Sequence, residues 1–216
     1  MRCDSRFERE ARTRGFLSVA GVDEAGRGSL FGPVFAAAVI LSPDRPIRGL
    51  NDSKQLDPET RERLAVEIRA SARAWAVASA DAVEIDRINI LQASRLAMRR
   101  AVEQLSPLPD FLLVDAISID LPLPQRGLIK GDARCRSIAA ASILAKVDRD
   151  ACMREWDARY PQYGFGENKG YSTPGHLRAL ELHGPAPEHR RTFEPVWRLL
   201  DPQLALPLFP QQEEGL

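Results

Sequence analysis

Residues 16–41 of this 216-residue chain read FLSVAGVDEAGRGSLFGPVFAAAVIL. Two apolar runs, at residues 16–24 and 31–41, flank a glycine-rich segment, which predicts two antiparallel strands side by side. The first run ends in two adjacent carboxylates, Asp23 and Glu24. Because an acid left unpaired in an apolar strand is costly, a purely structural interpretation is weakest for this pair. The paired acids therefore indicate a functional site where the first strand ends.

Hydrophobic periodicity and breaker residues outside this stretch predict alternating strands and helices. The expected helices cover residues 57–72, two stretches within 83–105, 136–160 and 174–183, and the further expected strands cover 73–80, 111–114 and 127–130. Asp57 and Pro58 suit the N-cap and the first position of the first helix. Residues 1–14 read as a solvated arm or short helix, and residues 161–172 as a loop. This order predicts an α/β chain on one mixed sheet, with the helices after residue 133 added to it.

Composition and charge exclude few classes of partner. The formal net charge is zero, which neither indicates nor excludes a nucleic acid, since phosphate contact needs only a local basic patch. No apolar run approaches the roughly 20 residues that span a bilayer, and the charged N-terminus lacks the apolar core of a secretory signal. We therefore expect a cytoplasmic protein with no membrane partner. The cysteines, Cys3, Cys135 and Cys152, read as idle thiols of a reducing compartment.

Carboxylates, and not histidines, are the candidate metal ligands. His176, His183 and His189 show no zinc-binding spacing. Asp115 ends a second apolar strand and Asp132 follows a third, and ligands of α/β sheets bind at the carboxyl ends of strands. Crowded carboxylates need a neutralising cation, and oxygen ligands suit Mg²⁺ or Mn²⁺. From position alone, Asp132 could equally be a helix N-cap, and Asp115 could begin a turn.

Four lysines stand out because 26 of the 30 basic residues are arginine. They are Lys54, Lys130, Lys146 and Lys169. A compact ammonium group suits a phosphate or a site near metals. Lys146 lies in a buried-looking helix and equally fits a structural ion pair. Three further acids, Asp120, Asp148 and Asp150, are expected to be solvated or salt-bridged rather than ligands.

The string GVDEAGRGSLFGPV (21–34) closely resembles the opening motif of the ribonuclease HII family. The resemblance continues in order through LNDSKQL (50–56), EIDRINILQAS (84–94), FLLVDA (111–116), IKGDARCRSIAAASILAKVDRD (129–150), YPQYGFGENKGYSTPGH (160–176) and HRRTFEPV (189–196). A lone Gly-Arg-Gly is a weak signal, because it is also typical of an ordinary tight turn. So many motifs in one order, from about residue 18 to residue 197, exclude a chance match.

The resemblance implies a ribonuclease H-like fold. This is an α/β architecture with a five-stranded mixed sheet flanked by helices and a C-terminal helical extension. It also implies an N-terminal arm at residues 1–16, a catalytic domain at 17–198 that includes the helical extension, and a tail at 199–216. The last six residues, QQEEGL (211–216), read as frayed.

The resemblance further implies which residues form the site. The family's four acidic positions fall on Asp23, Glu24, Asp115 and Asp132, which would be both catalytic residues and ligands of a divalent metal, Mn²⁺ or Mg²⁺. The implied substrate-binding residues are Gly26, Arg27, Gly28, Lys54, Lys146 and Tyr171. In the family, backbone groups of the Gly-Arg-Gly motif read the 2′-hydroxyl of the ribonucleotide, and the tyrosine stacks on the deoxyribose at the RNA–DNA junction. Without the resemblance, Tyr171 reads as a core or loop aromatic.

The implied function is that of a metal-dependent endonuclease. It would hydrolyse the phosphodiester on the 5′ side of a ribonucleotide, in RNA/DNA hybrids and in duplex DNA with embedded ribonucleotides, and leave a 3′-hydroxyl and a 5′-phosphate. A metal-bound water would be the nucleophile. The implied cellular roles are removal of misincorporated ribonucleotides and processing of RNA in hybrids, and we expect a monomer.

Two alternatives stay open. The sister class, ribonuclease HIII, usually carries an additional N-terminal DNA-binding domain and lacks the Gly-Arg-Gly motif. A non-catalytic module on the same scaffold could bind hybrids, although it could then also lose acids that are present here. The basic segment HRR (189–191) fits either a protein partner or contact of Arg190 and Arg191 with duplex phosphates.

Two positions depart from the usual pattern of the family. Ser29 stands where the family usually has proline. Ala116 and Ile117 stand where many members have Gly-Asn or a similar polar pair. Neither departure touches the four acids, and the second concerns the rim of the site and hence substrate preference.

Overall fold

The computed structural model describes residues 3–201, and the expected frayed segment 211–216 lies outside them. Five strands form one sheet in the order β3-β2-β1-β4-β5. They are β1 (Val19–Ala25), β2 (Val34–Ile40), β3 (Ala74–Ala80), β4 (Phe111–Asp115) and β5 (Gln125–Leu128). β1 pairs antiparallel with β2 and parallel with β4, so the expectation of a mixed sheet is confirmed.

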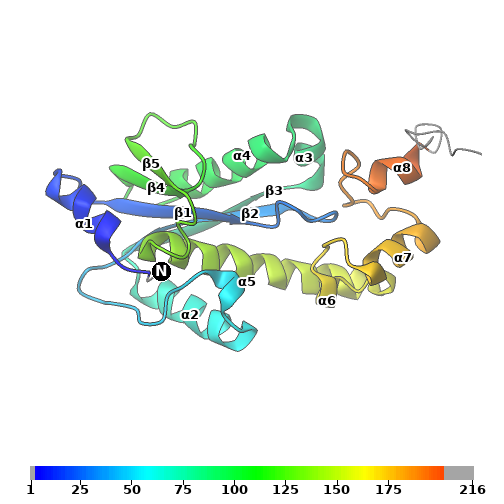
Figure 1. The fold of residues 1–216 in the computed structure, drawn as a ribbon, viewed down its shortest axis with the longest axis horizontal. Coiled ribbons are helices and arrows are strands. Elements are labelled where there is room, and N and C mark those ends of the chain that lie inside the picture. The colour runs from blue at the N-terminus through cyan, green and yellow to red at the C-terminus, as the bar shows by residue number, and fades with distance from the viewer. Residues whose placement is uncertain (1–2, 202–216) are drawn as a thin grey trace, which may run out of the picture.

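Helices cover both faces of this sheet. They are α1 (Arg6–Thr13), α2 (Pro58–Ser71), α3 (Ala82–Ile88), α4 (Ile90–Glu103), α5 (Arg136–Arg159), α6 (Phe165–Asn168), α7 (Pro174–His183) and α8 (Val196–Leu200), with 3-10 turns η1 (Ser53–Gln55) and η2 (Pro161–Tyr163). α2 and α5 lie on one face and α3 and α4 on the other, while α6, α7 and α8 extend beyond one end of the sheet (Figure 1). η2 and α6 fall within residues 161–172, which were expected to be a loop. Within residues 3–201, no helix is long and apolar enough to span a bilayer.

Small residues let α5 lie directly against the middle of the sheet. A side-chain carbon added to Gly21 of β1 would come within 2.1 Å of the backbone of Ser137, so only glycine fits at this crossing. Ala37 of β2 packs in the same cluster as Ala140 and Ala141 of α5, all fully buried. This close packing fixes the start of α5 beneath the strand that carries the paired acids.

The N-terminal helix is packed against the sheet rather than solvated. Phe7 and Ala11 of α1 are buried in a cluster with residues of β4 and β5. The buried carboxylate of Glu8 accepts a hydrogen bond from the Ser137 amide at 2.8 Å. Because this amide lies at the N-terminal end of α5, a negative charge there is favourable. Glu8 thereby joins the first helix to the beginning of α5.

The last strand begins two residues earlier than the hydrophobic pattern predicts. β5 runs from Gln125 to Leu128, whereas Ile129 is 75% exposed and Lys130 has a positive φ of 53°. The side-chain amide of Gln125 accepts a bond from the Ile119 amide and donates to the Ile119 carbonyl, both at 2.8 Å. This contact anchors the start of the strand, and no local sequence pattern reveals it.

Candidate active site

Three carboxylates from separate elements meet at one edge of the sheet. Asp23 lies two residues before the end of β1, Asp115 ends β4, and Asp132 lies between β5 and α5. One oxygen of each lies within 4.8 Å of the other two. The parallel register that pairs Val22 with Val114 brings the carboxyl ends of β1 and β4 together. The meeting of Asp23 and Asp115 therefore follows from the sheet topology.

Backbone amides orient all three of these carboxylates, and the Glu24 amide donates to Asp23 Oδ1 at 2.7 Å. The Gly131 amide donates to Asp115 Oδ1 at 2.6 Å, and the Ala133 amide donates to Asp132 Oδ1 at 2.8 Å. Asp132 is not the N-cap of the following helix, because Cys135 holds that position. The helix-cap alternative for Asp132 is therefore wrong, and its carboxylate is available to the cluster.

The electrostatics of the cluster favour a bound cation. Burial is the largest influence that raises the pKa of Asp23, Asp115 and Asp132 above their ordinary values. The negative charges of Glu24 and Asp115 raise the pKa of Asp23 further. Like charges crowded in a buried place are stabilised when a cation joins them, and carboxylate oxygens are preferred ligands of Mg²⁺ and Mn²⁺. The donor set therefore fits a hard divalent cation.

Glu24 lies beside this triad rather than within it. Its Oε1 pairs with the guanidinium of Arg27 at 3.1 Å, while its Oε2 is buried without a hydrogen-bond partner. Side chains of consecutive strand residues point to opposite faces, which explains why Asp23 and Glu24 do not share one tight cluster. The unpartnered oxygen is the atom of Glu24 that could still ligate a cation.

A cavity of about 500 Å³ adjoins the acids. Its walls are formed by Glu24, Ala25, Gly26, Arg27, Gly28, Ser53, Lys54, Ser142, Lys146 and Tyr171. The structure thus brings together every residue that the resemblance implies for substrate binding, although they come from four separate parts of the chain. The charge of Lys54 also lowers the pKa of Asp115 and of Asp132, which places this lysine near the acidic cluster as well.

Two buried arginines lie against the Gly-Arg-Gly turn, and one of them bonds to it. Gly26 has a φ of 95°, and a side-chain carbon there would lie 2.0 Å from Nε of Arg149. Arg190 is fully buried and donates to the carbonyl oxygens of Gly26 and Arg27, both at 2.8 Å. The prediction that Arg190 contacts duplex phosphates is therefore wrong, because its buried guanidinium already donates to backbone carbonyls. Arg191 is exposed, and its contact with phosphate stays a prediction.

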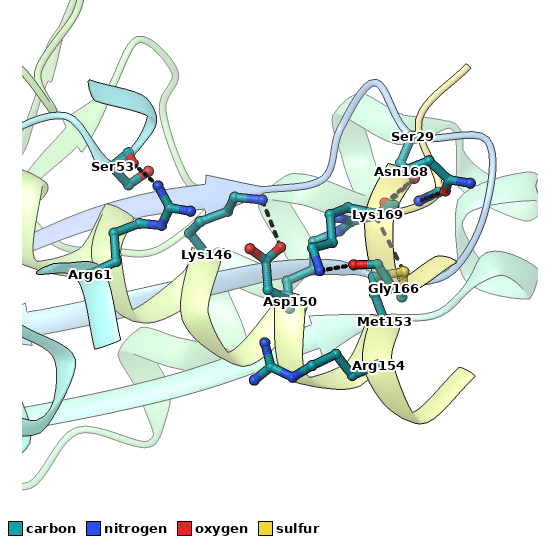
Figure 2. A network of polar contacts seen from close by, with 12 residues as sticks. Ser29, Ser53, Arg61, Lys146, Asp150, Met153, Arg154, Gly166, Asn168 and Lys169 are labelled. Carbon is teal, nitrogen blue, oxygen red and sulfur yellow. Dashed lines mark hydrogen bonds and ion pairs between the residues drawn. The ribbon is translucent and has the colours of Figure 1, made fainter. Parts of the chain in front are cut away.

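Lys146 is engaged in an ion pair as well as lining the cavity. Its ammonium lies 2.6 Å from the carboxylate of Asp150, one turn further along α5 (Figure 2). Asp148 pairs with Arg69, so the expectation that Asp148 and Asp150 are salt-bridged is confirmed. Lys130 is exposed on the turn after β5 and does not line the cavity.

Three polar residues of the site escaped the sequence reasoning. Ser53 and Ser142 line the cavity with their hydroxyls 3.0 Å apart, and the hydroxyl of Ser142 lowers the pKa of Asp23. The charge of Asp52 raises the pKa of both Asp115 and Asp132. Asp52 and Ser53 belong to the NDSKQL motif, which was the available signal, whereas Ser142 reads as an ordinary residue of a buried helix.

The chain is similar over most of its length to proteins of one family. The family model described as Ribonuclease HII matches residues 20–198. A ribonuclease HII from Solibacter usitatus is 67% identical over 195 residues, which cover 90% of this chain and 86% of that protein. A ribonuclease HII from Koribacter versatilis is 52% identical over 206 residues, which cover 95% of this chain and 81% of that protein.

Solved structures show the same fold. The ribonuclease H2 of Pyrococcus horikoshii OT3 superposes with a TM-score of 0.70 at 28% identity, covering 85% of this chain and 97% of that one. The RNase HII of Archaeoglobus fulgidus, solved in a complex with PCNA, gives a TM-score of 0.70 at 27% identity and covers 82% of this chain and 96% of its own. Bst-RNase HIII, at 21% identity and a TM-score of 0.63, shares the fold alone. With its ordered motifs, its fold and a family match across residues 20–198, this chain belongs to the ribonuclease HII family, whose members are endoribonucleases of the ribonuclease H type.

Proposed function

We propose that this chain hydrolyses the phosphodiester on the 5′ side of a ribonucleotide, in RNA/DNA hybrids and in duplex DNA with embedded ribonucleotides, and leaves 3′-hydroxyl and 5′-phosphate ends. One observation carries the proposal. The acidic cluster that fits a metal adjoins a cavity lined by residues 26–28 and Tyr171, and Glu24, which follows Asp23 directly in β1, also lines this cavity. One site thereby combines a cutting centre with walls suited to select a ribonucleotide. We place this activity in a cytoplasmic monomer.

We infer that Asp23, Asp115 and Asp132 hold Mn²⁺ or Mg²⁺ and that Glu24 completes the ligand set. A divalent cation, when bound, supplies a polarised water as nucleophile and stabilises the leaving oxygen. The carboxylates fix the place of the cation, and the backbone bonds to Asp115 and Asp132 fix those carboxylates in turn. Lys54, whose charge already acts on these two acids, would balance the approaching phosphate.

The selection of a ribonucleotide falls to the cavity walls. The 2′-hydroxyl distinguishes RNA from DNA, and backbone groups of the Gly-Arg-Gly turn would bond to it. The two bonds from Arg190 to the carbonyls of Gly26 and Arg27 support a turn held in one conformation. Tyr171 lines the same cavity and is 36% exposed, which leaves part of its ring available to stack on the adjoining deoxyribose.

The test is cleavage of a DNA duplex that contains a single ribonucleotide, in Mn²⁺, in Mg²⁺ and in EDTA, with the cut mapped on a denaturing gel. We expect one cut on the 5′ side of the ribonucleotide, only with metal, and many turnovers when substrate is in excess. An all-DNA duplex is the control. Binding without turnover would favour the non-catalytic alternative, and a cut at another bond would reject the proposal.

We also propose a protein partner, a homologue of PCNA. The relative from Archaeoglobus fulgidus was solved in a complex with PCNA. Residues 203–209 of this chain, outside the described part, read QLALPLF, a glutamine followed by four large apolar residues within seven positions. Short segments of this composition are typical of peptides that dock into an apolar groove of a folded partner.

A labelled peptide of residues 202–216 should bind a purified PCNA homologue in a fluorescence anisotropy titration. The matched peptide with Leu206, Leu208 and Phe209 replaced by alanine should bind much more weakly, because it lacks the apolar anchors. Equal binding of the two peptides would reject this partner without affecting the proposed reaction.

A further inference from the structure

The segment after α7 is joined to the chain that follows the Gly-Arg-Gly turn. The amide of Arg190 donates to the Leu30 carbonyl at 2.9 Å, and Phe31 forms an antiparallel bridge with His189. Residues 188–190 are therefore attached, backbone to backbone, directly behind one wall of the cavity. Their side chains then decide what else this short segment holds in place.

The side chain of Arg190 extends the attachment into the turn itself. Its two terminal nitrogens donate to the carbonyls of Gly26 and Arg27 at 2.8 Å, and Nε donates to the Gly32 carbonyl at 3.0 Å. The guanidinium is fully buried, and burial, together with the charge of Arg149, lowers its pKa to about 9. A planar fork that binds three carbonyls fixes the turn in both position and orientation.

His189 connects the same segment to Tyr171 through a second histidine. Nδ1 of His189 accepts a bond from the Ala186 amide at 2.8 Å, which leaves the proton of the neutral ring on Nε2. This Nε2 lies 3.0 Å from Nε2 of His176, and Nδ1 of His176 donates to the Tyr171 carbonyl at 2.9 Å. The two rings therefore form one directional chain of hydrogen bonds from the Ala186 amide to the backbone of Tyr171.

The surroundings of both histidines favour the neutral form, which the chain of hydrogen bonds requires. Burial, and then the neighbouring His176, lowers the pKa of His189 to about 4, and burial also lowers the pKa of His176. Nδ1 of His189 lies 3.3 Å from the Ala186 carbonyl as well, but this contact is longer than its bond to the amide and would need a second proton on the ring. The shorter bond and the lowered pKa agree on the same tautomer.

We propose that His176, His189 and Arg190 are positioning residues that hold the Gly-Arg-Gly turn and Tyr171 at a fixed separation, and that this separation sets the preference for a ribonucleotide joined to DNA. The inference rests on the proposed function, because it takes the turn and Tyr171 as the readers of the 2′-hydroxyl and the next deoxyribose. Both readers must contact adjacent nucleotides at once, so a misplacement of about 1 Å costs up to about 100-fold in rate. A continuous hybrid has no such junction, and its cleavage depends less on the separation.

A role in packing alone does not account for this arrangement. The rings of His176 and His189 pack against Phe165 at centroid distances of 5.3 and 5.9 Å, in a cluster where apolar side chains would avoid the cost of burying polar atoms. What the histidines add is direction, because their bonds end on one particular atom, the carbonyl oxygen of Tyr171.

The first test measures kcat and KM on a duplex with one ribonucleotide and on a continuous hybrid. We expect His176→Leu to lower kcat/KM on the first substrate about tenfold and to change the second less than about twofold. His176→Asn should recover most of the selectivity, because the asparagine amide can replace Nδ1 as donor to Tyr171. His183→Asn is the matched control: His183 lies in the same helix but is exposed, and we expect wild-type values.

The second test asks whether these residues act through Tyr171 and the turn. In a Tyr171→Ala background, His176→Leu should cause no further loss of selectivity, because the residue it positions is already gone. Arg190→Lys keeps the charge but loses the fork, and it should reduce selectivity. Arg178→Lys, at an exposed position of α7 to which no role in binding is assigned, should not.

The outcomes separate this inference from the function on which it rests. Equal losses on both substrates for His176→Leu, or additive losses in the Tyr171→Ala background, would overturn the inference alone. If the wild type does not cut at a single ribonucleotide, or Tyr171→Ala keeps full selectivity, the proposed function fails instead. Should His176→Leu not fold, ¹⁵N NMR of the wild type decides, since protonation of His176 on Nε2 instead of Nδ1 would contradict the proposed chain.

Discussion

The fold places Asp23 where the negatively charged form of its carboxyl group is unfavourable. Burial, and then the charges of Glu24 and Asp115, raises its pKa well above the ordinary value. A carboxyl pKa that is raised by folding stabilises the fold at low pH, and this contribution is lost as the pH rises. We expect Asp23→Asn to abolish metal-dependent cleavage and to increase the free energy of unfolding of the metal-free protein at pH 8 by about 1–2 kcal/mol. Urea denaturation in EDTA measures the change.

The exposed Asp44→Asn is the control for this substitution, and neither its activity nor its stability should change. Addition of Mn²⁺ should raise the Tm of the wild type and leave that of Asp23→Asn nearly unchanged, because a cation that binds only the folded state stabilises it. Cleavage by Asp23→Asn near the wild-type rate in Mn²⁺ would show that the site is assigned wrongly.

Ala116 adopts a conformation that suits glycine. It follows Asp115 directly, is exposed and has a φ of 55°. A non-glycine residue in the left-handed region costs about 1–2 kcal/mol, while glycine loses about 0.5–1 kcal/mol in backbone entropy. We therefore expect Ala116→Gly to stabilise the fold by roughly 0.5 kcal/mol in thermal denaturation. Destabilisation by this substitution would mean that the backbone at Ala116 is not strained.

The roles of single residues could be predicted where local sequence determines them. Asp23 and Asp115 were identifiable because the hydrophobic pattern shows where their strands end. Arg190 was not, since HRR reads as a basic surface segment and its burial depends on pairing with residues 30–32. The same pairing places His189 against His176. The spacing of the histidines in the sequence gives no sign of this contact.

At the scale of elements, the crossing of β1 by α5 leaves no room for a side chain. A carbon added to Gly21 would lie 2.1 Å from a backbone atom of Ser137, so a strand or a helix would have to move. We expect Gly21→Ala to destabilise the fold by about 3 kcal/mol or more, measured by guanidinium denaturation. Gly175→Ala in α7 is the control, because nothing lies within 4 Å of the added carbon and we expect no loss. Similar stability of the two variants would contradict the close crossing.

Elements bounded by strong local signals were predicted well. Asp57 caps α2 as expected, with its carboxylate accepting a bond from the Thr60 amide at 2.8 Å. The start of β5 was missed because a contact between Gln125 and Ile119, and not hydrophobicity, determines it. The sequence did not distinguish a solvated arm from a short helix at residues 1–14. The buried contact of Glu8 with the start of α5, which favours a packed helix, depends on residues far along the chain.

At the scale of the whole molecule, the buried histidine pair makes stability depend on pH. The pKa of His189 falls from 6.5 to about 4 on folding, through burial and then through His176. A lowered histidine pKa contributes stability that is fully present above the unfolded value and is lost as the pH falls towards the folded value. We expect this group to remove about 2–3 kcal/mol between about pH 7 and about pH 4.5, measured by urea denaturation at each pH.

The acids of the site act in the opposite direction, because their raised pKa values favour the fold as the pH falls. The comparison must therefore be made against His189→Gln, which keeps a donor towards His176 but cannot be protonated. The difference between the two curves of unfolding free energy against pH isolates the contribution of His189. Parallel curves for the wild type and His189→Gln would contradict the prediction.

The attachment of Arg190 to the carbonyls of Gly26 and Arg27 also bears on the order of synthesis at the ribosome. The three acids of the cluster are all present once residue 132 has been translated, whereas the turn gains its anchor only when residue 190 follows. A nascent chain therefore contains the three acids proposed to bind the metal well before the geometry proposed to choose a ribonucleotide. Translation therefore supplies the anchor of the turn last, and a chain that ends before residue 190 lacks this anchor although it contains all three acids.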